Sequence, residues 1–91
     1  MVIYDLGVNY DSRKSFYGKA RVEEQGHKVI LWSYDTAVLS YDEEQGLLNI
    51  SGIYSNTTLR HIKEFLKQWF NLDLNKNEIE NIIKTHGVYL K

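Results

Sequence analysis

Residues 29–66 read VILWSYDTAVLSYDEEQGLLNISGIYSNTTLRHIKEFL, and within this stretch the spacing of apolar residues changes. The first part consists of short apolar or alternating segments between polar turns, which is typical of β-strands. In the last part Leu59, Ile62 and Phe65 recur at the helical period of about 3.6 residues, which indicates an amphipathic helix. Strands followed by helices predict an α+β fold, with the helices packed on one face of a sheet.

The expected sheet is antiparallel, because its segments follow one another through short turns. About four strands are expected within residues 15–54, and the segment that begins at Val2 is a candidate for an additional N-terminal strand. The four predicted strands cover residues 15–24, 27–34, 37–41 and 47–54. Both faces of the segment from Val29 to Tyr34 are largely apolar, which predicts a central strand that is covered on both sides.

Two helices are expected after the sheet, over about residues 56–70 and 76–86. Ser55, Asn56 and Thr57 are all suitable N-caps for the first helix, and the pattern does not choose among them. Asn75 stands three residues before Glu78 and predicts a capping box at the second helix, with asparagine in place of serine or threonine. After that helix, residues 88–91 fit either a short added strand or a docked tail.

Length and composition exclude several classes of protein. With 91 residues the chain is expected to form one α+β domain, residues 1–91. The absence of cysteine excludes disulfides, thiolate zinc sites and cysteine nucleophiles. The apolar runs are far shorter than the roughly 20 residues that span a bilayer, and the first residues do not resemble a signal peptide. We therefore expect a cytoplasmic protein that does not associate with a membrane.

The sequence offers little that resembles a catalytic or metal site. His27, His61 and His86 are too far apart in sequence for the ligand spacings that zinc sites use. The adjacent carboxylates, such as Glu23 and Glu24, fall near predicted turns, where they are usually solvated. No phosphate-binding loop, dinucleotide-binding motif or nucleophile elbow is present. The prediction is a protein that is not an enzyme, with no catalytic residue, no metal and no cofactor.

Charge is unevenly distributed along the chain. Residues 1–55 carry five basic and eight acidic side chains, a net charge of −3, whereas residues 56–91 carry six basic and four acidic side chains, a net charge of +2. On the first predicted helix, three cations and Glu64 are expected along the solvent side. These cations and two outward strand residues form a candidate contact with nucleic-acid phosphates: Lys19, Arg21, Arg60, Lys63 and Lys67. The alternative is a solvated face that keeps the protein soluble.

Two short motifs carry a family resemblance. Residues 33–38 read SYDTAV and residues 54–65 read YSNTTLRHIKEF. They resemble a family of small proteins from phages and mobile elements of low-GC Gram-positive bacteria, with the patterns Ser-Tyr-x-Thr-x-Val and Tyr-Ser-x-Thr-Thr-x-Arg-His-Ile-x-x-Phe. Residues 15–20 resemble that family's Ser-Phe-Tyr-x-Lys-Ala opening, so the resemblance covers about residues 15–70. Asn56 and the second helix depart from the family pattern.

The resemblance implies a context rather than a chemistry, because no biochemical activity belongs to that family. Small phage accessory proteins are often inhibitors of host defence systems such as CRISPR-Cas or restriction. The resemblance therefore implies a non-enzymatic interaction protein that binds and blocks a host macromolecule, with an unidentified host protein as partner. The alternative is a small nucleic-acid-binding accessory protein that uses the basic face of the first helix. A homodimer formed through an edge strand is also left open.

Four residues of the motifs form a candidate partner-binding patch: Tyr34, Tyr54, Arg60 and His61. A structural role is the favoured alternative for two of them, since most side-chain hydrogen bonds serve the fold. In that interpretation Arg60 pairs with Asp35, and His61 donates a hydrogen bond to a backbone carbonyl.

Overall fold

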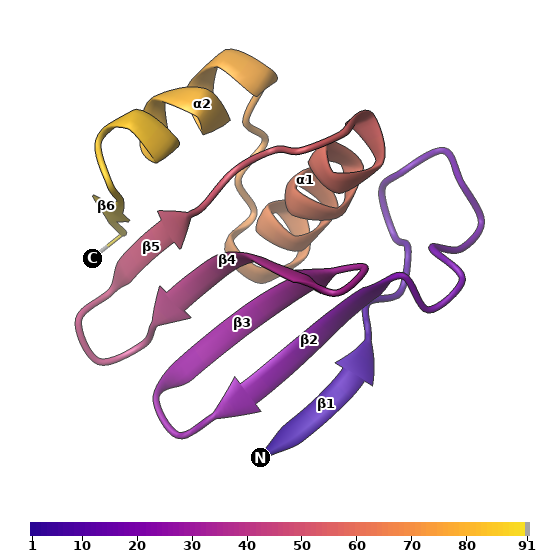
Figure 1. The fold of residues 1–91 in the computed structure, drawn as a ribbon, viewed down its shortest axis with the longest axis horizontal. Coiled ribbons are helices and arrows are strands. Elements are labelled where there is room, and N and C mark those ends of the chain that lie inside the picture. The colour runs from indigo at the N-terminus through magenta and orange to yellow at the C-terminus, as the bar shows by residue number, and fades with distance from the viewer. Residues whose placement is uncertain (91) are drawn as a thin grey trace.

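The computed structural model describes residues 1–90, which form an antiparallel sheet of six strands with two helices packed against one face (Figure 1). The strands are β1 (Val2–Asp5), β2 (Ala20–Gln25), β3 (Lys28–Ser33), β4 (Thr36–Asp42), β5 (Leu47–Ile50) and β6 (Val88–Tyr89). Each strand lies beside its neighbours in chain order. The α+β class and the C-terminal helices are confirmed, whereas the sheet has six strands rather than about four.

The helices are α1 (Asn56–Phe70) and α2 (Lys76–Lys84). Their apolar sides and the facing side of the sheet form one core, in which Leu31, Ile62 and Phe65 are fully buried. Burial of each such side chain stabilises the fold by about 1.5–3 kcal/mol. Within residues 1–90, no helix is long and apolar enough to cross a membrane.

Within residues 1–90, no second layer covers the opposite face of the sheet (Figure 1). The prediction that β3 is covered on both sides is therefore wrong, since Ile30 and Trp32 on this face are only partly buried. The Trp32 Nε1–H donates to Glu23 Oε1 at 3.0 Å and so satisfies a polar group on this partly apolar surface. An antiparallel sheet tolerates such one-sided solvation.

Two strand boundaries differ from the prediction by several residues, and in each case the residues that are not in the strand include a tyrosine with a positive φ. The strand expected from Ser15 begins only at Ala20, because Tyr17 has a φ of +53° and Gly18 a φ of +74°. The strand expected to reach Tyr54 ends at Ile50, and Tyr54 itself has a φ of +59°. A left-handed backbone cannot continue a β-strand, whose φ is about −120° to −140°.

The helix ends follow recognisable capping rules. Ser55 is the N-cap of α1, and its side chain accepts the backbone N–H of Thr58. The predicted capping box of α2 is confirmed, with Asn75 and Glu78 bonded reciprocally. α2 ends at Lys84, two residues earlier than predicted.

The segment after α2 turns back to the sheet and forms a strand. His86 and Gly87 both have positive φ, which reverses the chain direction after the helix. Val88 and Tyr89 then pair with β5 as strand β6. Of the two alternatives that the sequence leaves open, the structure therefore has the added strand at these two residues, while Lys91 lies outside the described residues.

Candidate functional site

Three exposed tyrosines lie where β1 and β3 end and where α1 begins, and we call this part of the surface the tyrosine end. Tyr17, Tyr34 and Tyr54 have φ values of +53°, +56° and +59°, and their exposed fractions are 75%, 44% and 67%. For a residue with a Cβ atom, this backbone conformation costs about 1–2 kcal/mol. Strained residues of this kind cluster at functional sites. The tyrosine end is therefore the first candidate surface.

Two hairpin turns of the same length show that the turn at Tyr34 requires a positive φ but does not require a tyrosine. The pairs Gln25–Lys28 and Ser33–Thr36 each close a two-residue loop. In the first loop the initial position is Gly26, with a φ of +59°, which suits the glycine preference of such turns. In the second loop Tyr34 takes that position at +56°. A bulky ring thus stands where hairpin geometry alone would favour glycine.

A buried hydrogen-bond network connects the end of β3 to the start of α1. Ser33 Oγ lies 2.9 Å from Thr58 Oγ1 and 2.8 Å from His61 Nδ1, and all three residues are buried. Thr58 also donates its backbone N–H to Ser55 Oγ at 3.1 Å. Buried polar groups that bond one another in this way fix the relative position of two elements.

The network also places two of the tyrosines. Tyr34 directly follows Ser33, and Tyr54 directly precedes Ser55, so each ring is attached to the backbone beside a network member. This arrangement accounts for much of the spacing within the two motifs, because four motif residues form the network: Ser33, Ser55, Thr58 and His61. The network thereby fixes the backbone beside Tyr34 and Tyr54, whose side chains are exposed to solvent.

His61 occupies the interior rather than the surface. Its side chain is 0% exposed, and its ring packs against Phe16 and Tyr34 at centroid distances of 4.5 Å and 6.0 Å. Burial lowers the pKa of His61, and the Asp11 carboxylate opposes this effect in part. The predicted hydrogen bond from His61 to a backbone carbonyl is wrong, because its Nδ1 is bonded to the Ser33 hydroxyl. The other ring nitrogen, Nε2, is buried without a hydrogen-bond partner among the described residues. His61 therefore supports the candidate patch from beneath.

Arg60 fastens the loop between β1 and β2 onto α1. Its Nη1 donates to Asp11 Oδ1 at 2.9 Å. The expected pairing with Asp35 is wrong, because Asp35 lies 3.7 Å from Arg21 instead. Arg21 Nη2 also donates to the backbone oxygen of Tyr34 at 2.9 Å, and thus stabilises the strained turn.

Glu64 holds the same loop through its backbone. Its carboxylate is 3% exposed and accepts the N–H groups of Asn9, Tyr10 and Asp11 at 3.0, 3.0 and 2.8 Å. Gln68 Nε2 donates to this carboxylate as well. The expectation that Glu64 lies on the solvent side of the helix is wrong, because the loop covers it. The loop and α1 thereby form one continuous surface.

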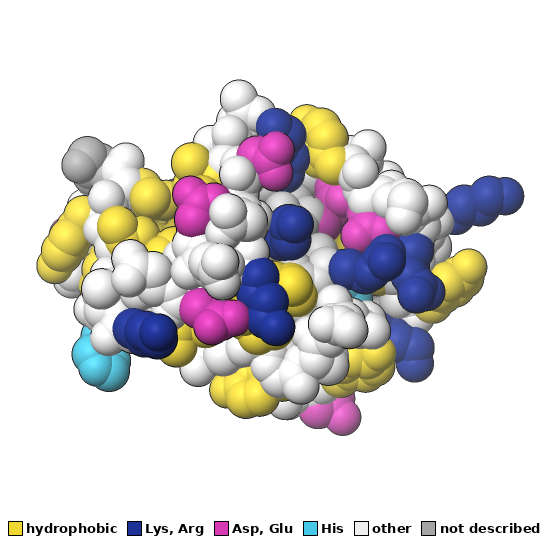
Figure 2. Space-filling view, turned by 90° about the horizontal axis from the view of Figure 1, so that it is seen from above, with side chains coloured by type: hydrophobic (Ala, Val, Ile, Leu, Met, Phe, Trp, Pro, Cys, Tyr) yellow, Lys and Arg dark blue, Asp and Glu magenta, His cyan; other side chains and the backbone are white. Residues whose placement is uncertain are grey.

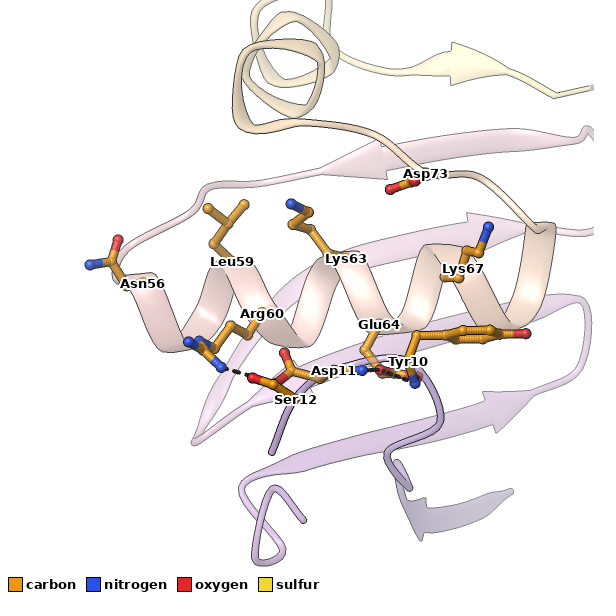
Figure 3. A pocket seen from close by; sticks show the side chains of 10 residues that line it. All are labelled: Tyr10, Asp11, Ser12, Asn56, Leu59, Arg60, Lys63, Glu64, Lys67 and Asp73. Atoms are coloured by element: carbon orange, nitrogen blue, oxygen red, sulfur yellow. Dashed lines mark hydrogen bonds and ion pairs between the residues drawn. The ribbon is translucent and has the colours of Figure 1, made fainter. Parts of the chain in front are cut away.

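A groove of about 630 Å³ lies between this loop and the segment after α1, and we call it the α1 groove (Figure 3). Its walls contain Arg60, Lys63 and Lys67, together with Tyr10 and Asp73 on the facing segments. Lys67 Nζ lies 5.6 Å from the centroid of the Tyr10 ring. Three of the five predicted phosphate-contacting residues are therefore brought together in one hollow.

The other two predicted cations belong to the tyrosine end. Lys19 Nζ lies 5.4 Å from the centroid of the Tyr34 ring, and Arg21 contacts the same residue through its backbone oxygen. Because Asn56 and Arg60 at the start of α1 also line the α1 groove, the groove opens onto the tyrosine end. All five cations thus border one extended surface.

The charge of the sheet is polarised from end to end. The turns at the far end carry Glu24, Asp42, Glu43 and Glu44 against Lys28, which is four acidic groups and one basic group. The tyrosine end, its adjoining loop and the α1 residues that hold this loop carry Arg13, Lys14, Lys19, Arg21 and Arg60 against Asp5, Asp11, Asp35 and Glu64, which is five against four. Figure 2 shows Lys and Arg side chains gathered toward the right of the view, where this loop and the start of α1 lie. An anionic ligand would be drawn to the tyrosine end.

Gly52 is shaped to accommodate Tyr54, and its replacement tests this contact. A Cβ at Gly52 would lie 2.8 Å from Tyr54 Cζ and 3.1 Å from Cε2. Because the ring is exposed and can turn away, Gly52→Ala is expected to change the free energy of unfolding by less than about 0.5 kcal/mol while displacing the ring. Thermal unfolding and the NMR shifts of the Tyr54 ring protons measure both effects. Gly7→Ala is the matched control, since nothing lies within 4 Å of its added Cβ, and unchanged ring shifts in Gly52→Ala would contradict the contact.

Sequence reasoning missed several contributors to this surface. The predicted strand over residues 15–24 contains Tyr17, and Tyr10 is not among the predicted site residues. One signal for the buried network was present: Thr58, His61 and Phe65 recur at i, i+3 and i+7, so they share one face of the helix with the apolar stripe.

Comparison with family models gives a match over residues 4–84 to a group described as "Family of unknown function (DUF8033)". No curated protein and no solved structure matches the chain. The matched segment extends from β1 to the last turn of α2, and it includes the tyrosine end, the buried network and the α1 groove. The chain therefore belongs to the family of unknown function DUF8033.

Proposed function

We propose that this chain is a non-enzymatic binding protein of phage or mobile-element origin that acts by occupying and blocking a host macromolecule. The contact surface consists of the tyrosine end and the α1 groove. The resemblance of residues 33–38 and 54–65 to phage and mobile-element proteins supports the origin and the host context. An inhibitor of a host defence system is the role that this context favours.

The observation that carries the proposal is the exposure of Tyr34 and Tyr54 on a strained backbone. Tyr34 and Tyr54 are exposed, at 44% and 67%, although each residue stands at a φ near +60° that glycine would occupy more easily. Burial of the rings therefore does not explain why tyrosine is present. Tyrosine supplies a large, rigid contact area in binding surfaces, which explains both the exposure and the strain.

The non-enzymatic part of the proposal is supported by the position of His61. This imidazole directly follows Arg60 in the chain, yet it is fully buried and bonded to Ser33, so it cannot reach a molecule bound at the surface. Glu64, the buried carboxylate of the groove, is occupied by backbone N–H groups. Both groups thus serve to shape the surface.

A capture experiment tests the proposal. The immobilised chain is incubated with a lysate of a Gram-positive host, and the eluate is analysed for both protein and nucleic acid. The wild-type chain is expected to retain a specific macromolecule that the Tyr34→Ala/Tyr54→Ala variant loses. Tyr89→Ala is the matched control, because this ring is 65% exposed on β6 at the far end of the sheet. Equal retention by the double variant, or no retention by the wild type, would refute the proposal.

A further inference from the structure

The chemistry of the tyrosine end and the α1 groove indicates a particular ligand class. Aromatic rings and cations alternate over this surface: Tyr34 has Lys19 beside it, and Tyr10 has Lys67 beside it. Cations that follow a phosphate backbone and rings that stack on bases are the two elements of proteins that bind single strands. The same surface combines both.

The cations of α1 are spaced along the groove rather than clustered. Arg60, Lys63 and Lys67 line it in order (Figure 3), and the first and the last are seven positions apart along the helix. At a rise of about 1.5 Å per residue this is roughly 10 Å, close to the length of three stacked nucleotides at about 3.4 Å each. The groove therefore suits a short stretch of backbone.

The acidic side chains that border the same part of the groove are mostly engaged within the protein. Asp11 accepts a hydrogen bond from Arg60, and Glu64 accepts three backbone N–H groups. Asp73, on the segment after α1, lies between Lys63 and Lys67 in the view of Figure 3. The repulsion that a phosphate would meet is therefore reduced on the side of the groove formed by the loop.

A single strand fits this surface better than a duplex does. In a duplex the base faces are stacked on one another, so exposed tyrosine rings would find no partner. A single strand presents its bases to Tyr34 and Tyr54 while its phosphates follow Lys63 and Lys67. The acidic turns at the far end of the sheet would repel the strand and restrict it to the tyrosine end.

We propose that the tyrosine end and the α1 groove bind single-stranded nucleic acid, with bases stacked on Tyr34 and Tyr54 and with phosphates beside Lys19, Lys63 and Lys67. This inference rests on the proposed function, for which it names the macromolecule. Recognition is through stacking and charge, so it tolerates many sequences.

Fluorescence anisotropy with labelled oligonucleotides of about 12 nucleotides, a length typical of single-strand binding sites, tests the inference. Single-stranded DNA and RNA are compared with a duplex of the same sequence. The wild type is expected to bind the single strands more tightly than the duplex. Tyr34→Ala/Tyr54→Ala is expected to weaken binding by about 30-fold or more, since each stacked base contributes about 1–3 kcal/mol. Tyr34→Gly/Tyr54→Gly removes the rings while suiting the positive φ, so it provides a second variant whose fold is less at risk.

The charged contacts have their own readout. Lys63→Ala/Lys67→Ala is expected to weaken binding and to lower the slope of log affinity against log salt by about 1.4, or about 0.7 for each lost phosphate contact. Lys84→Ala, at the end of α2, and Tyr89→Ala are the matched controls and should bind like the wild type. Thermal unfolding confirms that each variant is folded.

If oligonucleotides bind, two outcomes would still overturn the inference. One is duplex binding as tight as single-strand binding, and the other is unchanged binding after both tyrosines are replaced. Absence of oligonucleotide binding, together with a host protein retained by the lysate experiment through Tyr34 and Tyr54, would refute single-strand recognition while leaving the proposed function in place. Retention of neither would refute both.

Discussion

Glu64→Gln is expected to lower the free energy of unfolding by about 3 kcal/mol, since each hydrogen bond to a charged group contributes about 1.5–3 kcal/mol. The carboxylate accepts backbone N–H groups from Asn9, Tyr10 and Asp11. Glutamine keeps the shape but turns one acceptor into an NH₂ group, which then faces N–H donors. For a chain of this size the melting temperature should fall by about 15 °C. Thermal and urea unfolding measure the change.

Glu43→Gln is the matched control, because it removes the same charge from an exposed position in the turn between β4 and β5. Its melting temperature should stay within a few degrees of the wild type, as surface substitutions usually change stability by less than about 0.5 kcal/mol. Hydrogen exchange at residues 9–11 gives a second readout, since these amides should lose protection in Glu64→Gln. Similar melting temperatures for the two variants would show that Glu64 does not hold the loop.

Acidification is expected to destabilise the protein through His61. Burial lowers the pKa of this imidazole below its ordinary value of 6.5, so the unfolded chain binds a proton more readily than the folded chain. This contribution to stability is complete above pH 6.5. It is lost as the pH falls from 6.5 toward the lowered pKa of the folded state, by at most about 1.4 kcal/mol per pH unit. Urea unfolding over this pH range measures the slope.

His61→Ala identifies the origin of that slope. The substitution is expected to lower the free energy of unfolding at neutral pH by about 2–3 kcal/mol, because it empties a fully buried position and removes a partner of Ser33. It should also make stability less dependent on pH below 6.5. His27→Ala is the control, since that side chain is 73% exposed and should leave both quantities unchanged. A wild-type pH slope in His61→Ala would exclude this assignment.

The helices could be predicted from the sequence almost to the residue, because their signals are local. The apolar period defined α1, and Asn75 with Glu78 defined the start of α2. Strand boundaries failed at Tyr17 and Tyr54, since tyrosine has a high propensity for strands. Their positive φ values depend on contacts made elsewhere in the fold, which no local pattern contains.

The cations of the candidate site could be predicted from the sequence, but the hydrogen-bond partners of its charged residues could not. The cations of α1 were found because they share one face of a helix. The partner of Arg60 is Asp11, 49 residues earlier, and the groups bonded to Glu64 are 53 to 55 residues earlier. Sequence spacing carries no information on contacts of this range. The loop that makes them has no regular structure, so only the folded chain revealed that it covers Glu64.

The end-to-end separation of charge makes this small protein an electric dipole, although its formal net charge is only −1. The electric field of a long polyanion exerts a torque on a dipolar protein before the two molecules touch. The molecule would therefore rotate its positive end toward the polymer during approach, so that a larger share of collisions is productive. Added salt should therefore slow association, because it screens the field that orients the molecule.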